Sequence, residues 1–259
     1  MYWQAVALGY VSYLAVVALT RREFARARLP LSIAAAVAWG AFAIAGRAHL
    51  PPALDVAIPA LILLGGYWLS GLLFVRPEAR IECWLQSVDH AVLRRMLAWY
   101  RHAPRFVTEY FELSYLLVYL AVPAGATTLA LAGHADQVGR FWTVVLLAEF
   151  ACYGMLPWIQ TRPPRALEAP NPPPQTHVIR HLNRRIVDRA SIQANTVPSG
   201  HAAGALATAL AVGSSMPMTG ALFVMLALSI AVATVLGRYH YLVDTVLGVL
   251  VAIVAWTLI

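Results

Sequence analysis

Long apolar stretches alternate along the chain with short segments that carry most of its arginines. A helix needs roughly 20 mainly apolar residues to cross a bilayer. Eight stretches come close to this length, at residues 2–20, 30–47, 55–75, 106–132, 139–159, 199–214, 218–237 and 241–259. The pattern predicts an all-α fold, a polytopic transmembrane helix bundle. Residues 1–54 form extra N-terminal membrane helices and residues 55–259 form the main membrane domain.

Two connecting segments have patterns of their own. Residues 76–105 carry six arginines among tryptophans and apolar residues at helical spacing, which is typical of an amphipathic helix lying in the membrane interface. Residues 160–198 begin with a proline-rich part that excludes a regular helix. Their second part, from His177 to Arg189, is basic and amphipathic, so we expect a surface helix that covers another part of the chain.

The composition agrees with a membrane protein and excludes several functions. Of 259 residues, 60% are apolar and 12% are charged, whereas soluble domains have about 25% charged residues. The same values exclude a disordered chain. All 19 basic residues are arginine, so there is no lysine for a Schiff base, a P-loop or a general base. Cys83 and Cys152 lie far apart in or beside apolar segments, which indicates free thiols.

The arginines indicate partners and orientation. The formal net charge is +7, yet no long basic stretch is free to follow a duplex, so we expect no nucleic-acid partner. Lipid headgroups of the bilayer and a phosphate-bearing substrate fit these arginines better. All but Arg47 and Arg140 fall on one side of the predicted bundle. The positive-inside rule therefore favours the cytoplasmic face of the cell membrane for that side.

Three polar segments border the predicted spans, and polar residues at membrane depth are costly enough to indicate function. The first is Arg162-Pro163, the second is Pro198-Ser199-Gly200-His201, and the third runs from Arg238 to Asp244. Two crossings separate the second segment from the third. The eight-span count therefore places all three motif segments at the same membrane face.

The residue types in these segments suit phosphoryl transfer. His240 and Asp244 share a helical face, so the carboxylate can hold one ring nitrogen while the other attacks phosphorus. His201 can give a proton to the leaving oxygen. An N-cap at Ser199, followed by Gly200, brings backbone amides to an anion.

The guanidinium groups of Arg162, Arg165 and Arg238 can hold phosphate oxygens. A metal site is the alternative interpretation of two histidines and an aspartate. Because arginines repel cations, we expect phosphate there and neither a metal nor another cofactor.

Other polar residues have two interpretations each. Glu109 and Glu112 share a face of the fourth span; they bind an active-site arginine or acceptor hydroxyls, or they form structural ion pairs. Tyr239 and Tyr241 flank His240 and belong to the same acceptor region or support it. We expect structural partners for Glu149 and Asp55. A set of four further histidines is expected to be merely interfacial: His49, His90, His102 and His134.

Together the motif segments resemble the type 2 phosphatidic acid phosphatase superfamily of lipid phosphatases and phosphotransferases. Its pattern is a lysine, six residues and Arg-Pro; then Pro-Ser-Gly-His; then Ser-Arg, five residues, a histidine, three residues and an aspartate. Residues 198–201 match the second element completely, and His240 with Asp244 matches the end of the third. Met155 stands in place of the lysine, and Arg165 is our candidate replacement.

The resemblance covers about residues 106–259 and implies a six-helix phosphatase-type core with about two extra N-terminal spans and the interfacial helix. It implies His240 as nucleophile, Asp244 as its orienting partner, His201 as acid, Arg162 and Arg238 as phosphate clamps, and no metal. The spacing around His240-Tyr241, with Arg-Pro-Pro-Arg upstream, is similar to the branch containing inositol phosphorylceramide synthases. The expected function is therefore a membrane lipid phosphatase, with headgroup phosphotransfer or non-catalytic binding or transport of anionic lipids as alternatives.

Overall fold

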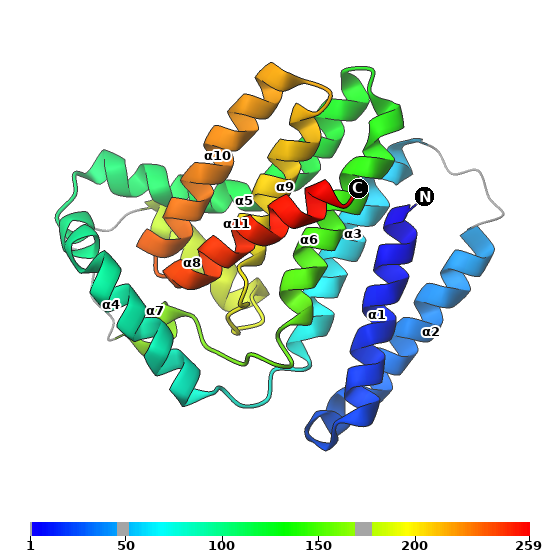
Figure 1. Ribbon diagram of the computed structural model, residues 1–259, viewed down its shortest axis with the longest axis horizontal. Helices are drawn as coiled ribbons and strands as arrows, with labels where there is room; N and C mark the ends of the chain where they lie inside the picture. The colour runs from blue at the N-terminus through cyan, green and yellow to red at the C-terminus, as the bar shows by residue number, and fades with distance from the viewer. Residues whose placement is uncertain (1, 46–51, 169–177) are drawn as a thin grey trace.

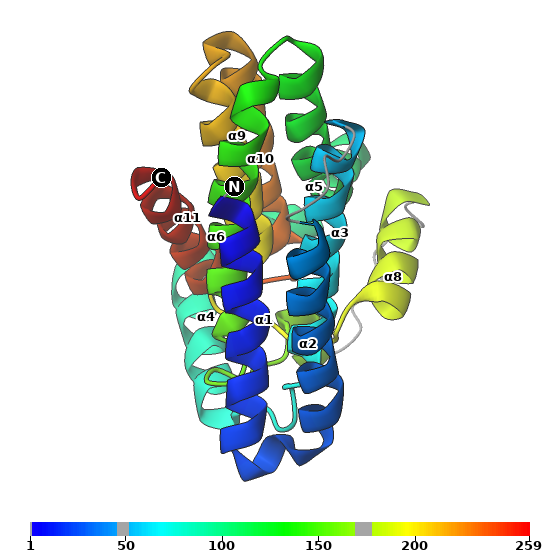
Figure 2. The same ribbon diagram turned by 90° about the vertical axis from the view of Figure 1, so that its right-hand side faces the viewer.

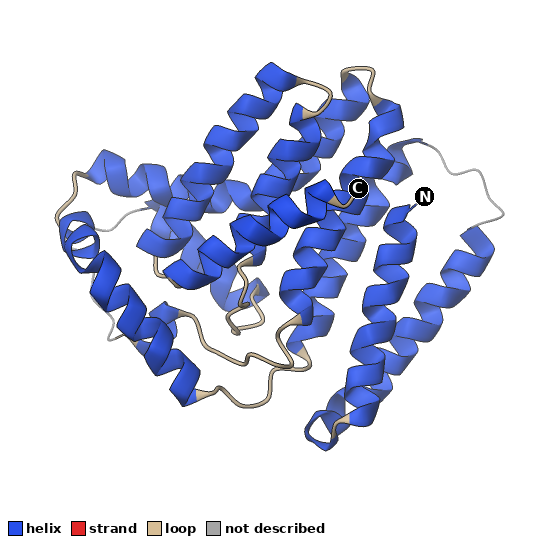
Figure 3. Cartoon of the chain, viewed as in Figure 1, coloured by secondary structure: helices blue, strands red, loops and turns tan. Residues whose placement is uncertain are grey.

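The computed structural model describes residues 2–45, 52–168 and 178–259. Within these ranges the chain is helical apart from loops and one isolated antiparallel bridge between Thr161 and Asn195 (Figure 3). The α-helices are α1 (Tyr2–Thr20), α2 (Arg28–Ala45), α3 (Pro52–Gly71), α4 (Ala79–Arg101), α5 (Arg105–Leu131), α6 (Val138–Gly154), α7 (Pro164–Leu167), α8 (Val178–Ala190), α9 (Gly200–Gly213), α10 (Pro217–Leu236) and α11 (Leu242–Thr257). Two short 3₁₀ helices, η1 (Arg22–Ala27) and η2 (Ala135–Gln137), complete the order. The prediction of an all-α bundle is confirmed.

Each of the eight predicted apolar stretches contains a helix, but the helices differ in length. In the described part of the chain, four are long and apolar enough to cross a membrane: Tyr2–Thr20, Arg22–Ile44, Arg105–Leu131 and Pro217–Leu236. The other four stretches contain α3 with 20 residues, α6 with 17, α9 with 14 and α11 with 16. Helix α6 ends at Gly154 rather than at 159, whereas α9 agrees with the predicted stretch 199–214 within a residue at each end. The count of eight spans stays a prediction.

Helix α9 lies at the centre of the bundle. It packs against α5, α6, α10 and α11, and Figure 1 shows α11 crossing obliquely in front of it. Alanine and glycine side chains make up most of its buried surface. Small side chains allow neighbouring backbones to approach closely, so four helices can meet around one.

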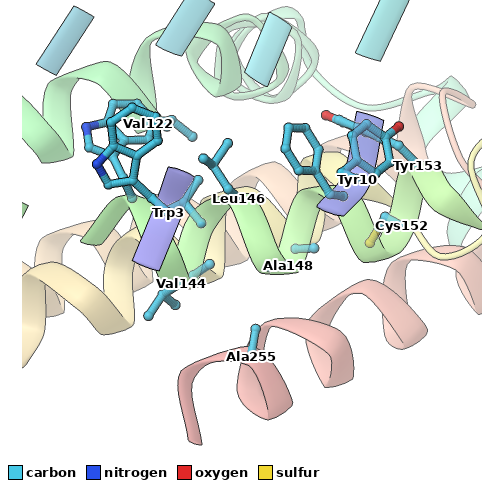
Figure 4. Close-up of a cluster of buried hydrophobic side chains, with 14 of the residues drawn as sticks. Trp3, Tyr10, Val122, Val144, Leu146, Ala148, Cys152, Tyr153 and Ala255 are labelled. Atoms are coloured by element: carbon cyan, nitrogen blue, oxygen red, sulfur yellow. The ribbon is translucent and has the colours of Figure 1, made fainter. Parts of the chain in front are cut away.

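The N-terminal helices extend this bundle on one side. Helices α1 and α2 lie side by side in Figure 2, and α1 also packs on α3 and α6. The largest buried cluster joins α1 to α6, with Trp3 and Tyr10 against the α6 side chains shown in Figure 4. Tyr10 stacks on Phe150 with ring centroids 4.0 Å apart. Cys152 is a buried free thiol in this cluster and Cys83 is an exposed one.

Helices α4 and α8 lie on opposite sides of the bundle in Figure 2. Helix α4 falls inside the predicted interfacial segment, with Trp84, Trp99 and four arginines on its exposed face. Helix α8 matches the predicted surface helix within a residue at each end and packs on α5 through its buried residues Asn183 and Val187. The proline-rich residues 171–174 lie outside the described part of the chain.

Two glycines of α9 make room for a side chain of α6. The carboxylate of Glu149 occupies the space that a Cβ atom would need at Gly204, and it also lies against Gly200. The Tyr153 hydroxyl donates a hydrogen bond to that carboxylate. Glu149 therefore has a structural partner, as expected, and glycine at position 204 is required by this close approach.

We expect Gly204→Ala to lower the free energy of unfolding by about 1–3 kcal/mol, because the added methyl group overlaps the Glu149 carboxylate. Thermal unfolding of the detergent-solubilised protein measures the change. Gly65→Ala is the matched control, since a Cβ atom there meets no heavy atom within 4 Å. Equal melting temperatures for the two variants would contradict the packing argument.

Candidate active site

Two histidines from distant segments meet at one end of the bundle. His240 lies between α10 and α11, and His201 lies in the first turn of α9. Nε2 of His240 is 3.3 Å from Nδ1 of His201, and the tautomers decide which nitrogen donates. His240 is 4% exposed, so its ring is almost entirely shielded from solvent.

Asp244 lies behind His240 and is held by two other groups. Its Oδ2 atom is 3.6 Å from Nδ1 of His240. The same oxygen accepts hydrogen bonds from the Asn195 amide at 2.8 Å and from the Tyr241 backbone N–H at 3.0 Å. The carboxylate is therefore fixed in a position from which it can orient the imidazole ring.

Asn195 is a site residue that the motif analysis missed. Besides its bond to Asp244, its amide donates to the Thr161 hydroxyl at 3.1 Å, and its backbone N–H donates to the Thr161 carbonyl at 2.7 Å. Asn195 lies just before the second motif segment, and it links Thr161, just before the first segment, to Asp244 in the third. The only signal in the sequence is a polar residue three positions before Pro198.

The start of α9 has the predicted cap. The Ser199 hydroxyl accepts from the Ala202 N–H at 3.4 Å, which confirms Ser199 as the N-cap. The Ser199 N–H donates to the Asp244 carbonyl oxygen at 2.9 Å, so the second and third motif segments touch through their backbones. Binding of phosphate by Ser199 and Gly200 stays a prediction.

The three predicted phosphate-binding arginines have different surroundings. Arg162 forms hydrogen bonds to Glu82 through its backbone N–H, Nε and Nη2. Arg238 is bonded to Asp89 and Glu168 through all three guanidinium nitrogens. These two guanidinium groups therefore already have carboxylate partners.

Arg165 is the arginine whose charge reaches the histidines. Its guanidinium carbon is 5.5 Å from the centre of the Tyr239 ring. Among the described residues, no carboxylate lies within ion-pair distance of it. Burial, together with the positive charge of Arg165, lowers the pKa of His240 to about 3. His240 is therefore neutral near pH 7, as a nucleophilic imidazole must be.

Stacked aromatic rings hold the ring of His201 in place. The His201 ring stacks on Tyr115 with centroids 5.4 Å apart, and Tyr115 stacks on Tyr239 at 3.6 Å. The Tyr239 hydroxyl donates to the Glu112 carboxylate at 2.9 Å, and the Asn183 amide of α8 donates to the same carboxylate oxygen at 2.8 Å. Helix α8 therefore covers the far end of this stack.

The remaining predicted residues occupy structural positions around the site. Glu112 also lies 3.7 Å from Nε of Arg180, whereas Glu109 lies 3.6 Å from the Arg105 guanidinium one turn earlier. The Tyr241 hydroxyl donates to the Arg162 carbonyl oxygen at 3.2 Å. His90 and His102 are exposed and His134 is half-buried. His49 and the side chain of Asp55 lie outside the described part of the chain.

Comparison with known protein families gave one match. A family model described as the PAP2 superfamily matches residues 83–258. The matched range contains both histidines, all three motif segments and most of α4. The comparisons with curated proteins and with solved structures gave no match.

Asn195→Ala should lower the free energy of unfolding by about 1–3 kcal/mol, because Asp244 and Thr161 both lose a buried donor. The measurement is thermal or denaturant unfolding in detergent. Gln137→Ala is the control, since the Gln137 amide bonds Asp136 on an exposed surface. A loss no larger than that of the control would show that the Asn195 bridge contributes little.

Proposed function

The chain belongs to the PAP2 superfamily, since the family model covers more than half of it, and from this membership we propose that it cleaves a phosphate ester or diphosphate of a membrane lipid through a phosphohistidine. Membership indicates a phosphatase or phosphotransferase. The observation that carries the finer proposal is the close pair of His240 and His201 beside Arg165, whose charge no described carboxylate neutralises.

The first step forms a bond between Nε2 of His240 and phosphorus. As the bond from phosphorus to the lipid oxygen breaks, His201, which is protonated once the anionic phosphate is bound beside it, gives its proton to that oxygen. Nδ1 of His240 keeps its proton toward Asp244, whose buried carboxylate favours the positive phosphohistidine that forms. The 3.3 Å contact between the two ring nitrogens supports a shared role on one substrate, and the two rings must separate to admit phosphorus and the leaving oxygen between them.

The second step releases phosphate. His201, now neutral, takes a proton from a water molecule while the water oxygen attacks phosphorus. The bond between phosphorus and Nε2 breaks, and both histidines return to their starting protonation states. All proton transfers run between His201 and an oxygen, so the proposed cycle needs no metal and no other cofactor.

Phosphate oxygens need positive partners throughout this cycle. Arg165 is free to provide a planar fork. Arg162 keeps Nη1 outside its bonds to Glu82, so it can contribute one further donor. Arg238 can hold the phosphate only by exchanging a present bond, because Asp89 and Glu168 accept from all three of its guanidinium nitrogens.

The substrate is a lipid because the site lies at one end of a membrane bundle. Its phosphate arrives at headgroup depth while its tails stay in the bilayer. The distribution of arginines favours the cytoplasmic face for this end. Transfer of a phosphorylated headgroup to a polyol such as inositol is the alternative, favoured by Arg162-Pro163-Pro164-Arg165 before the site.

The decisive assay is phosphate release by the detergent-purified protein from a panel of lipid phosphates and diphosphates, without metal and with EDTA. Release should resist EDTA and fall by about 10³-fold or more in His240→Ala, because the nucleophile is lost. His90→Ala, an exposed histidine of α4, is the control and should retain activity.

Other outcomes of this assay distinguish the alternatives. Formation of a phosphorylated polyol, with no free phosphate, when inositol or another polyol is added supports phosphotransfer. Lipid binding by wild type and His240→Ala alike, with no turnover under any condition, makes the protein a non-catalytic binding protein and overturns the proposal.

Arg165→Gln should raise KM and shift the acid limb of kcat/KM to higher pH. The lowered pKa of His240 keeps this ring neutral down to about pH 3, whereas an ordinary histidine becomes protonated near about pH 6.5. Removing the Arg165 charge favours the protonated ring, so the pKa rises and activity is lost at a higher pH. Profiles from about pH 2.5 to about pH 8 test the shift, because this range includes the wild-type limb. Arg140→Gln, at the other end of the bundle, should leave the limb unchanged.

A further inference from the structure

The inner face of α4 touches the first and third motif segments and Val197, the residue just before the second. Glu82, Leu85 and Asp89 follow one another at intervals of three and four residues, so they lie on one side of the helix. Glu82 and Asp89 are 3% and 0% exposed, and Leu85 is fully buried. Glu82 and Asp89 are the only acidic residues of α4, and both face the interior of the protein.

Asp89 holds the loop that carries His240 at both ends. Its Oδ2 atom accepts from Nη1 of Arg238 at 2.6 Å, and its Oδ1 atom accepts from the Leu242 backbone N–H at 3.0 Å. Arg238 is two residues before His240 and Leu242 is two residues after it. One carboxylate thus spans the whole loop.

The loop has a conformation that needs such support. Arg238 has φ of 62°, in the left-handed region that residues other than glycine rarely adopt. Its side chain reaches Asp89 from this conformation, and its carbonyl oxygen accepts the Arg165 N–H at 3.1 Å. The placement of both His240 and Arg165 therefore depends on how Arg238 is held.

The rest of the α4 face acts on the other segments in the same way. Glu82 accepts the Arg162 N–H at 2.8 Å as well as two guanidinium bonds. Leu85 packs with Val197 and Tyr241 in a single buried cluster. A buried ion pair gives little net stability relative to apolar packing of the same volume. The presence of these two carboxylates is therefore better explained by the positions that they impose on the motif segments than by a gain in the stability of the fold.

Building on the proposed function, we propose that Asp89 is a positioning residue for the nucleophile His240. By binding Arg238 and the first N–H of α11 together, it fixes the distance of Nε2 from the phosphorus atom. Asp89 touches neither the substrate nor the imidazole ring. Its removal should therefore slow the formation of phosphohistidine while leaving the affinity for the lipid phosphate nearly unchanged.

The test is Asp89→Asn, assayed on the best lipid phosphate found for the wild-type protein. Misplacement of a reacting group by about 1 Å costs about 10²-fold in rate, so kcat should fall by about that factor while KM stays within about twofold. Rapid-quench trapping of phosphohistidine should show the same loss. Asp188→Asn, an exposed aspartate of α8, is the matched control and should behave as wild type.

Leu242→Pro tests the same contact through the backbone. Proline lacks the N–H that Asp89 accepts, yet it is tolerated at the first position of a helix, which is where Leu242 lies. Its kcat should also fall. The two substitutions remove one contact, so their effects on kcat should be less than additive in the double variant.

The outcomes separate this inference from the proposed function. Wild-type turnover that His240→Ala abolishes establishes the nucleophile independently of Asp89. With that result in hand, unchanged kcat in Asp89→Asn overturns the positioning role, as does a loss of kcat that merely parallels a lower melting temperature. Asp89→Glu, judged by the same criteria, replaces Asp89→Asn where the latter does not accumulate.

Discussion

A charged side chain buried among apolar helices must find a partner, and this requirement organises the catalytic end of the bundle. Glu82 holds Arg162, Asp89 holds Arg238, and Asp244 is held by Asn195. Each pair joins segments that lie far apart in the chain. Of the three predicted phosphate-binding arginines, only Arg165 is left without a carboxylate among the residues described, and its charge, after burial, lowers the pKa of His240. The positive charge available for a phosphate is therefore that of Arg165, because Arg162 and Arg238 are already paired with carboxylates.

The fold could be predicted from the sequence because it depends on apolar run lengths, which are local properties. The meeting of His201 and His240 could also be predicted, because two crossings return the chain to the same face. The end of α6 was less accessible, since the helix stops at Gly154 and not at 159, whereas the bounds of α9 were predicted within a residue. The partners of the arginines were not accessible at all. The contact between Asp89 and Arg238 joins residues 149 positions apart, and nothing in either local sequence identifies the other.

The two amphipathic helices have different tasks, although their sequence patterns are alike. Helix α8 covers the stack of His201, Tyr115 and Tyr239 by way of Glu112 and Asn183. Helix α4 turns its carboxylates toward the motif segments and its arginines and tryptophans outward. The interfacial placement of α4 stays a prediction, and in that placement the helix would couple the depth of the candidate site to the membrane surface.

The shortness of α9 and the shielding of the histidine pair bear on the fate of the proposed phosphohistidine. A helix of 14 residues rises about 21 Å, whereas the hydrocarbon core is about 30 Å thick. The centre of the bundle is therefore shorter than the hydrocarbon core is thick, and His240, beside His201, is only 4% exposed because loops cover the pair. Water activity at the histidine pair is then set by the surrounding loops rather than by the bulk solvent. Whether the phosphoryl group passes to water or to a hydroxylated acceptor then depends on how well those loops exclude water.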